Sequence, residues 1–467
     1  MQRSQIINLA AGPSSLPEAV LAEAAAGLLN YNGTGIGVTE LSHRSADFQD
    51  LTNNLEHQIR SALNVPQTHV ILFTQGGGCG MFSSVVYNLL ARHYLLYPDI
   101  PDGERTLDYI ITGSWSKKAA EEARLLTVGT KAKVNVVVDA REHSASGKAF
   151  DRIPKHDSWK FSPAPAFVYY CDNETVDGVQ FSNDSSSSAA FPHHLLPKAI
   201  GSEIAPIPLV GDHSSSFLSR PILNMEQHAL IYAGAQKNVG PSGLTILIVR
   251  KDLLVDTVAA AKLSAPPTPT TMSYKVLADA GSLYNTPPMF SMYVSLLAVK
   301  YYAENGGLVS LEKLNRIKKE KVYEALDEGV KAGVFQGRVE KDSRSWMNVT
   351  FTLKNPELEK SFLTAATEKG MRGMKGHRSV GGREIVRVVM ISPHGYSFQF
   401  RHQVLFVQRR YREAGRYHRG LHAAVHPRAR NGVTLKGERM LFRLVLVGRS
   451  RTDCRSLWCN MKEKGRN

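Results

Sequence analysis

The chain has 467 residues, of which 43% are apolar and 21% charged, a composition typical of a globular protein and not of a disordered one. Its formal net charge of +15 would by itself favour a nucleic acid or an anionic membrane as a partner. The charge is unevenly distributed, because residues 383–467 carry +14 and residues 1–382 only +1. A basic-protein interpretation therefore applies only to the last 85 residues.

Several protein classes are excluded at this stage. Four cysteines are too few for a disulfide scaffold, and Cys454 and Cys459 have no second pair at zinc-ligand spacing. The start, MQRSQIINLAAGPSS, lacks the apolar core of a secretory signal. No apolar run approaches the roughly 18 residues of a membrane helix. We therefore expect a cytoplasmic protein with no metal site and no membrane partner.

Short β-branched runs alternate with helical patterns, which predicts an α/β layered fold. Helices are expected after Pro17 and from Met81, where apolar residues recur at helical spacing. Several candidate strands are apolar throughout, as expected for strands covered on both faces. The candidate strands are His69–Thr74, Tyr109–Thr112, Val134–Val138, Ala166–Cys171, Ile207–Val210, Leu230–Ala233 and Leu244–Val249.

The rest of the chain changes in character. The Ser-rich segment 182–194 and the Pro-rich segment 264–271 are predicted to be loops. A long helical region starts at Met292, followed by a strand at 346–353 and a helix at 357–370. These patterns predict an N-terminal segment and large α/β domain over 1–290, a smaller, incomplete α+β domain over 291–382, and an atypical tail over 383–467.

A glycine-rich turn follows the first candidate strand, in HVILFTQGGGCGMF. Bare backbone N–H groups at the start of a helix bind anions, and phosphate is the usual one. A plain tight turn explains the glycines equally well at this point. The spacing fits neither the dinucleotide-binding pattern nor a P-loop.

Three further residues occupy positions with chemical potential. Lys237 lies between glycines and short strands in YAGAQKNVGPSG, and an amine nucleophile needs the lowered pKa that apolar surroundings provide. Asp212 follows a strand and could hold a pyridine nitrogen protonated, whereas Trp115 could stack on a flat ring. Taken singly, a lysine reaching water, an aspartate capping a turn and a core tryptophan are the commoner interpretations. Together with a phosphate cradle, they point to pyridoxal 5′-phosphate.

The same segments resemble a known family. The motifs NLAAGPSSLP, ELSHRSADF, GGGCGMF, CDNETVDG, FLSRP, YAGAQKNVGPSGLT, SLYNTPP and GMKGHRSVGG occur in the order found in phosphoserine aminotransferases, from about Asn8 to Gly382. These are class-V, fold-type I enzymes that depend on pyridoxal phosphate. The resemblance implies a large domain with a mostly parallel seven-stranded sheet and a smaller α+β domain.

The resemblance also implies roles for individual residues at the cofactor. Lys237 is similar to the catalytic lysine that links to the cofactor, and Asp212 to the partner of its ring nitrogen. Trp115 is similar to the residue that stacks on the ring, and Thr175 to the donor at the ring hydroxyl. The cofactor phosphate would be bound by Gly78, Cys79 and Gln236, together with Asn285 and Thr286 from a neighbouring subunit.

The implied reaction is reversible amino transfer from L-glutamate to 3-phosphohydroxypyruvate, giving 2-oxoglutarate and O-phospho-L-serine, in a homodimer with shared active sites. His43, Arg44, His377 and Arg378 match the positions that contact the anionic groups of the substrate, which suits arginine as a bidentate partner of phosphate and carboxylate. Another transamination or lyase reaction on the same cofactor is an alternative.

The family pattern stops near residue 383. The family's arginine for the substrate α-carboxylate would fall at Glu384, and Arg383 is one residue out of place, on the opposite face of a strand. The tail has 16 Arg and 3 Lys and little regular patterning. A translated intron or reading-frame error, a basic arm that binds nucleic acid or acidic proteins, and a solvated tail are three interpretations. The first predicts impaired activity of the chain as written, and the second a protein without transaminase activity.

Overall fold

In the computed structural model, residues 2–101, 103–197, 206–353, 355–374 and 387–390 are described, and all belong to one contact unit, Met1–Glu413. Every helix within these ranges is too short or too polar to cross a bilayer. His377 and Arg378, as well as Glu384 and nearly all of the Arg-rich tail, lie outside the described residues.

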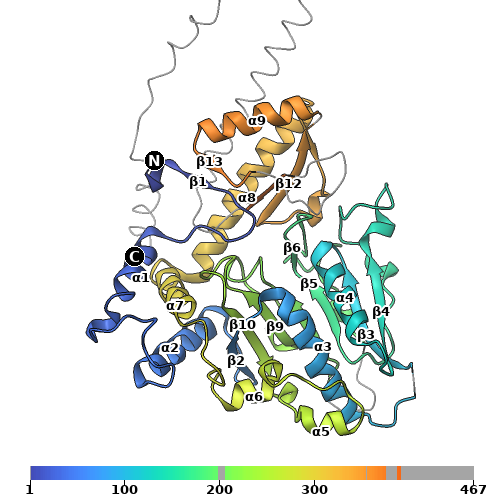
Figure 1. Cartoon of the computed structure of the whole chain (residues 1–467). Helices are drawn as coiled ribbons and strands as arrows, with labels where there is room; N and C mark the ends of the chain where they lie inside the picture. The colour runs from blue at the N-terminus through green and yellow to red at the C-terminus, as the bar shows by residue number, and fades with distance from the viewer. Residues whose placement is uncertain (1, 102, 198–205, 354, 375–386, 391–467) are drawn as a thin grey trace, which may run out of the picture. The chain divides into compact units, whose positions relative to one another are not determined.

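A seven-stranded sheet forms the centre of the large domain (Figure 1). Neighbouring strands are parallel except at β10, which runs antiparallel to both of its neighbours. All seven predicted strands are present, and the expectation of a mostly parallel sheet is confirmed. In spatial order they are β2 (His69–Thr74), β10 (Thr245–Arg250), β9 (His228–Gly234), β8 (Leu209–Asp212), β5 (Val168–Cys171), β3 (Arg105–Ile111) and β4 (Ala132–Asp139).

Helices cover both faces of this sheet. Because side chains alternate from face to face along each strand, a single strand contributes residues to the core on both sides. In β10, Ile246 and Ile248 belong to one buried cluster, whereas Leu247 and Val249 belong to another. The first cluster includes side chains of α1 (Glu18–Gly27), α2 (Ala46–Leu63) and α7 (Met289–Glu304). The second includes side chains of α3 (Gly77–Leu96), α4 (Ser114–Leu126), α5 (Thr257–Lys262) and α6 (Tyr274–Asp279). Burial on both sides explains why these strands are apolar throughout.

Two helices differ from the sequence prediction in where they begin or end. The helix expected from Met81 already begins at Gly77, because Gly76 takes a left-handed φ of 108° and lets the helix start directly after it. The long helical region is two helices, α7 and α8 (Gly307–Lys331), which are separated at Gly306 with φ 91°. The first of them packs on the large sheet, although the small domain was expected to begin near residue 290.

The small domain contains a three-stranded antiparallel sheet, β11 (Phe335–Gly337), β12 (Asn348–Leu353) and β14 (Arg387–Met390). Strand β12 and helix α9 (Pro356–Glu368) correspond to the strand and the helix predicted at 346–353 and 357–370. Strand β14 lies beyond residue 383, so the start of the segment that follows the last quoted motif contributes a strand to this sheet.

The N-terminal segment packs in the small domain. Strand β1 (Ile7–Asn8) pairs in parallel with β13 (Met371–Arg372), and Ile7 and Leu9 are buried in a cluster with residues of α8 and β12. A hairpin of β6 (Asn173–Glu174) and β7 (Val179–Gln180) follows the carboxyl end of β5. The predicted loops 182–194 and 264–271 contain only short turns of 3₁₀ helix and one isolated bridge.

Candidate active site

The carboxyl ends of six strands meet at one edge of the sheet, because all of its strands except β10 run in the same direction (Figure 1). Five of these ends, those of β2, β9, β8, β5 and β3, lead into segments with predicted site residues. In open α/β sheets, ligands bind at this edge. Most of the predicted cofactor residues follow one of these five ends. They are Gly78 and Cys79 after β2, Trp115 after β3, Thr175 after β5, Asp212 at the end of β8, and Gln236 and Lys237 after β9.

Lys237 is held in a setting that favours a reactive amine. Burial lowers its pKa to about 8, although the nearby Asp212 carboxylate acts in the opposite direction. Its Nζ donates a hydrogen bond to the carbonyl of Ala11 at 2.7 Å. Ser14 binds the same loop, since its N–H donates to the Gln236 carbonyl at 3.0 Å and its hydroxyl donates to the Lys237 carbonyl. The N-terminal GPSS segment therefore lies directly against the lysine loop.

Asp212 is buried and is oriented by its neighbours. The N–H of Ser214 donates to Oδ1 at 2.8 Å, and the Tyr232 hydroxyl donates to Oδ2 at 3.0 Å. The Tyr169 hydroxyl lies 2.8 Å from that of Tyr232. Burial raises the pKa of Asp212, whereas these donors and the Lys237 cation lower it. A buried, hydrogen-bonded carboxylate of this kind has a strong preference for a cationic N–H partner.

The glycine-rich segment forms the N-terminus of α3. The N–H of Gly77 donates to Thr245 Oγ1 at 2.8 Å, whereas the amides of Gly78 and Cys79 have no acceptor among the described residues. A Cβ atom on Gly78 would come within 3.8 Å of both Asp212 Oδ2 and Ser214 Oγ. The glycine therefore leaves space open between the helix start and Asp212, where two amides and the helix dipole favour an anion.

Glu174, the last residue of β6, links Trp115 to the segment that carries Thr175. Trp115 is the second residue of α4, and its N–H donates to Glu174 Oε2 at 2.8 Å. Thr175 directly follows Glu174 and is buried. Lys118 places its ammonium 4.5 Å from the centroid of the Trp115 ring. The predicted ring stacker and the predicted hydroxyl donor thus share one anchoring carboxylate.

The other residues predicted to bind the cofactor phosphate or the substrate, in segments 43–44 and 285–286, lie at or near the surface. Arg44, Asn285 and Thr286 are exposed, and His43 is half-buried. Thr286 Oγ1 lies 3.3 Å from His43 Nδ1, and Gln75 Nε2 donates to the Thr286 carbonyl at 3.2 Å. These residues of two distant segments therefore form one group beside the glycine-rich turn.

Sequence reasoning did not assign roles to several residues that build this site. Tyr169 and Tyr232 stand in apolar strands, and a buried tyrosine needs a partner for its hydroxyl, which was the available signal. Glu174 lies within a quoted motif, and so do Ala11 and Ser14. Nothing in the spacing of these residues indicated which backbone groups they would meet.

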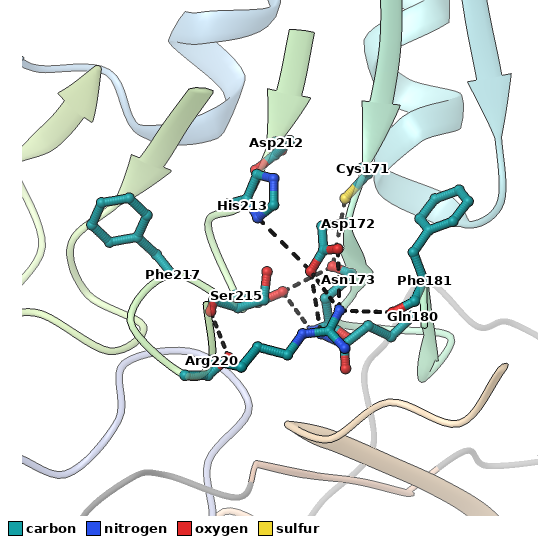
Figure 2. A network of polar contacts seen from close by, with 12 residues as sticks. Cys171, Asp172, Asn173, Gln180, Phe181, Asp212, His213, Ser215, Phe217 and Arg220 are labelled. Carbon is teal, nitrogen blue, oxygen red and sulfur yellow. Dashed lines mark hydrogen bonds and ion pairs between the residues drawn. The ribbon is translucent and has the colours of Figure 1, made fainter. Parts of the chain in front are cut away.

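A buried ion pair between Asp172 and Arg220 lies close to the segment that follows Asp212 (Figure 2). Arg220 Nη2 donates to Asp172 Oδ1 at 3.2 Å, to Oδ2 at 3.3 Å and to the Phe181 carbonyl at 2.7 Å. Burial raises the pKa of Asp172, but Arg220 and His213 outweigh this and keep it below its usual range. The pair joins the segment after β5, which carries Thr175, to the segment after β8.

A cavity of about 60 Å³ lies beside this ion pair and is lined by Tyr170, Asp172, Phe191, His213 and Arg220, among others. Tyr170 belongs to a different buried cluster from Tyr169 and Tyr232, which contact Asp212. Because adjacent strand residues point to opposite faces, the cavity lies on the face of the sheet opposite to Tyr169 and Tyr232.

Comparison with known proteins matches this architecture to one family. The family model described as aminotransferase class V matches residues 6–393. The chain belongs to the class-V aminotransferase family. A phosphoserine aminotransferase from Ectopseudomonas mendocina is 41% identical over 377 residues, which are 80% of this chain and 90% of that relative. The family match ends eleven residues beyond Gly382, the end of the last quoted motif, so residues 394–467 lie outside it.

Solved structures of class-V aminotransferases have the same fold. The phosphoserine aminotransferase of Bacillus circulans subsp. alkalophilus superposes with a TM-score of 0.72 at 34% identity, covering 86% of this chain and 98% of that one. A pyridoxal-phosphate-bound phosphoserine aminotransferase from Trichomonas vaginalis gives 0.70 at 31% identity, with 86% and 99% covered. The fold-type I class inferred from the motifs is thereby confirmed.

Proposed function

We propose that this class-V aminotransferase is a phosphoserine aminotransferase, which transfers the amino group of L-glutamate to 3-phosphohydroxypyruvate and yields O-phospho-L-serine and 2-oxoglutarate. The observation that carries the proposal is the set of residues gathered at one edge of the sheet, in a chain that is about 40% identical to phosphoserine aminotransferases over 80% of its length. His43 and Arg44 suit the carboxylate and phosphate groups that glutamate and 3-phosphohydroxypyruvate carry.

The residues present fit pyridoxal 5′-phosphate. The open space next to Gly78 suits its phosphate, as do the amides of Gly78 and Cys79, which have no acceptor among the described residues, and Gln236 follows the end of β9. The buried Asp212 carboxylate suits a protonated ring nitrogen, and Trp115 and Thr175 suit the ring face and its hydroxyl. When bound, this cofactor takes up the electron pair left at the substrate Cα and carries the amino group between the two substrates.

Lys237 provides the proton chemistry of the proposed reaction. With a pKa of about 8, a substantial fraction of its amine is neutral near physiological pH, so it can accept a proton from the substrate Cα and return it. The Ala11 carbonyl accepts a hydrogen bond from the amine and fixes its direction. Asp212, held by Ser214 and Tyr232, is fixed in the same way and needs no rearrangement when charge develops.

The substrate-binding residues support a shared site in a homodimer. His43 and Thr286 touch each other, and Arg44, Asn285 and Tyr284 are exposed around them. A cluster of this kind on the surface of one subunit is suited to completing the site of a second subunit, where Asn285 and Thr286 would reach the cofactor phosphate and Arg44 the substrate. His377 and Arg378, which lie outside the described residues, are proposed as further contacts to the anionic groups of the substrate.

Replacement of the proposed catalytic lysine tests the function. Lys237→Ala should lose both the visible absorbance band of covalently held cofactor and the transamination of phosphohydroxypyruvate by glutamate. Lys275→Ala on α6, which removes an exposed lysine paired with Asp279, serves as the matched control and should retain both. Wild-type protein that folds but neither takes up the cofactor nor transaminates would refute the proposal.

Mixing of two inactive variants tests the shared site. If Lys237 and Arg44 of different subunits form one site, refolded mixtures of Lys237→Ala and Arg44→Ala chains should regain activity. Random pairing gives half heterodimers with one intact site each, so about a quarter of the wild-type sites are expected. Activity that stays at the level of the separate variants would place both residues in one subunit's site.

A further inference from the structure

The first turn of α4 is capped by carboxylates from a different segment. The residue before the helix is Gly113, which has no side chain with which to cap it. Instead, Asp177 Oδ2 accepts from Ser114 N–H at 2.7 Å, Glu174 Oε2 from Trp115 N–H at 2.8 Å and Glu174 Oε1 from Ser116 N–H at 2.9 Å. Of the four amides that a helix start leaves unpaired, three are therefore satisfied by the hairpin β6–β7, and that of Gly113 donates to Ser116 Oγ at 3.1 Å.

The sequence of the helix start is adapted to this contact. Glu174 is completely buried, and a Cβ atom at position 113 would overlap its side chain. Glycine at 113 therefore lets the carboxylate approach the helix end on its axis, where the helix dipole attracts a negative charge. A carboxylate that accepts from two successive amides fixes both the position and the rotation of the first turn, and with them the Cα–Cβ direction of Trp115.

The hairpin is itself anchored on its far side by the small domain. Asn173 Nδ2 donates to Asn348 Oδ1 at 2.8 Å, and Trp346 N–H donates to Gln180 Oε1 at 2.7 Å. Ser345 N–H donates to the Gly178 carbonyl at 2.9 Å, and the Thr350 hydroxyl donates to the Asp177 carbonyl at 3.0 Å. Glu174 is thus mounted on a segment that is fixed at both ends of the hairpin.

We propose that Glu174 is a positioning residue that holds the Trp115 ring in register with Thr175, so that both meet the same cofactor ring. The inference rests on the proposed function, because it takes the cofactor to lie between these two residues. Thr175 is the next residue in the chain, so the Glu174 carboxylate fixes the position of Trp115, at the ring face, relative to Thr175, at the ring hydroxyl. A loosened Trp115 would leave the cofactor bound by its phosphate and by Lys237 but free to tilt.

The ionisation of Glu174 gives the contact a pH dependence. Burial raises the pKa of Glu174 to about 8, the Asp177 carboxylate acts in the same direction, and the Trp115 and Ser116 amides oppose both. The Cys171 thiol is a further titratable group near it, and burial raises the pKa of this thiol, so it stays neutral. A proton on Glu174 removes part of its capacity to accept from two amides, so Trp115 is held less tightly as the pH falls below about 8.

Substitution of Glu174 by glutamine in the holoenzyme tests the proposal. The amide retains one acceptor oxygen but turns an NH₂ group toward a second backbone N–H. Bound cofactor quenches tryptophan fluorescence, and the part of this quenching that is missing in a Trp115→Phe variant is due to Trp115. We expect Glu174→Gln to lose this Trp115-specific part. The rate of cofactor release should rise, and kcat should fall on the order of 10- to 100-fold with KM for glutamate nearly unchanged.

The control is Asp177→Asn, a carboxylate-to-amide change in the same hairpin that acts on Ser114 instead of Trp115. It should keep the Trp115 quenching and most of kcat, whatever it does to stability. Glu174→Gln with wild-type quenching, or equal loss in both variants, would overturn the proposal. If wild-type protein takes up no cofactor at all, the proposed function has failed, which is a different result.

A third measurement covers the case in which Glu174→Gln does not fold. In wild-type holoenzyme, the Trp115-specific quenching should weaken as the pH is lowered from about 9.5 to 6 and recover on return. Glu174→Asp, which retains the carboxylate on a shorter stem, should show an intermediate quenching. A quenching that is constant over this pH range would contradict the proposal without any variant.

Discussion

Removal of Arg220 should destabilise the chain by leaving the Asp172 carboxylate buried and unpaired. The side chains of both residues are nearly inaccessible, and Arg220 Nη2 supplies the bonds to Asp172 and to the Phe181 carbonyl (Figure 2). Breaking a buried pair by removing one partner costs about 3–5 kcal/mol. The lost bond to the carbonyl adds about 1 kcal/mol, so Arg220→Met is expected to cost at least 3 kcal/mol near pH 7.

His213 limits this loss. Its Nδ1 lies 3.9 Å from Asp172 Oδ2, and its pKa is lowered by burial and by Arg220 but raised by Asp172. Without Arg220, the imidazole can take up a proton and return part of the lost attraction. The double variant Asp172→Asn, Arg220→Met removes both charges of the pair and should regain at least about 2 kcal/mol over Arg220→Met alone.

The pH dependence distinguishes this cause from a packing defect. In the wild type, the pKa of Asp172 is lowered, so the pair contributes stability above the pKa of the unfolded chain, and this is lost as pH falls through the folded pKa. In Arg220→Met, burial is no longer outweighed and the pKa rises, so the penalty is present at neutral pH and disappears below about pH 4. Urea unfolding of cofactor-free protein should show a midpoint difference that narrows from pH 7 to pH 4. A cost below about 1 kcal/mol, or one independent of pH, would refute the reasoning.

Two further predictions concern stability. Burial lowers the pKa of His93 and of His228 to about 3, so between about pH 6.5 and 3 these two imidazoles are protonated only in the unfolded chain. Below about pH 6.5, each histidine should therefore lower the free energy of unfolding by up to about 1.4 kcal/mol per pH unit. Urea midpoints that stay level from pH 6.5 to 5 would contradict this. Gly178→Ala should cost about 2–4 kcal/mol, because φ is +77° and the new Cβ would meet Thr350 Oγ1 at 2.7 Å and the Asn348 carbonyl at 2.9 Å. Gly147→Ala, with φ +65° and nothing within 4 Å of the Cβ, is the control and should cost only about 1 kcal/mol; equal losses would mean that the contact with the small domain is unimportant.

The central sheet was predictable because its strands are buried on both faces. Runs such as VILF and ILIV are apolar at every position, as expected for a strand covered on both faces, and the strand at His69–Thr74 was located to the residue. The start of α3 was predicted four residues too late, at Met81 instead of Gly77, because a glycine run has no apolar residues at helical spacing. The left-handed conformation of Gly76 is what allows the helix to begin there.

The sequence by itself determined the candidate chemistry of Lys237, Asp212, Trp115 and Thr175, since their motifs and positions after strands are local features. Only the tertiary structure decided what surrounds them. Strand pairing places Cys171 beside Asp212, the alternation of side chains brings Tyr232 to that carboxylate, and the hairpin brings Glu174 to the start of α4. Strand β1 likewise pairs with β13 at the far end of the family-like region, which leads Ala11 to the lysine. These contacts join residues tens to hundreds of positions apart, and no local pattern encodes them, because they arise from packing and register between whole elements.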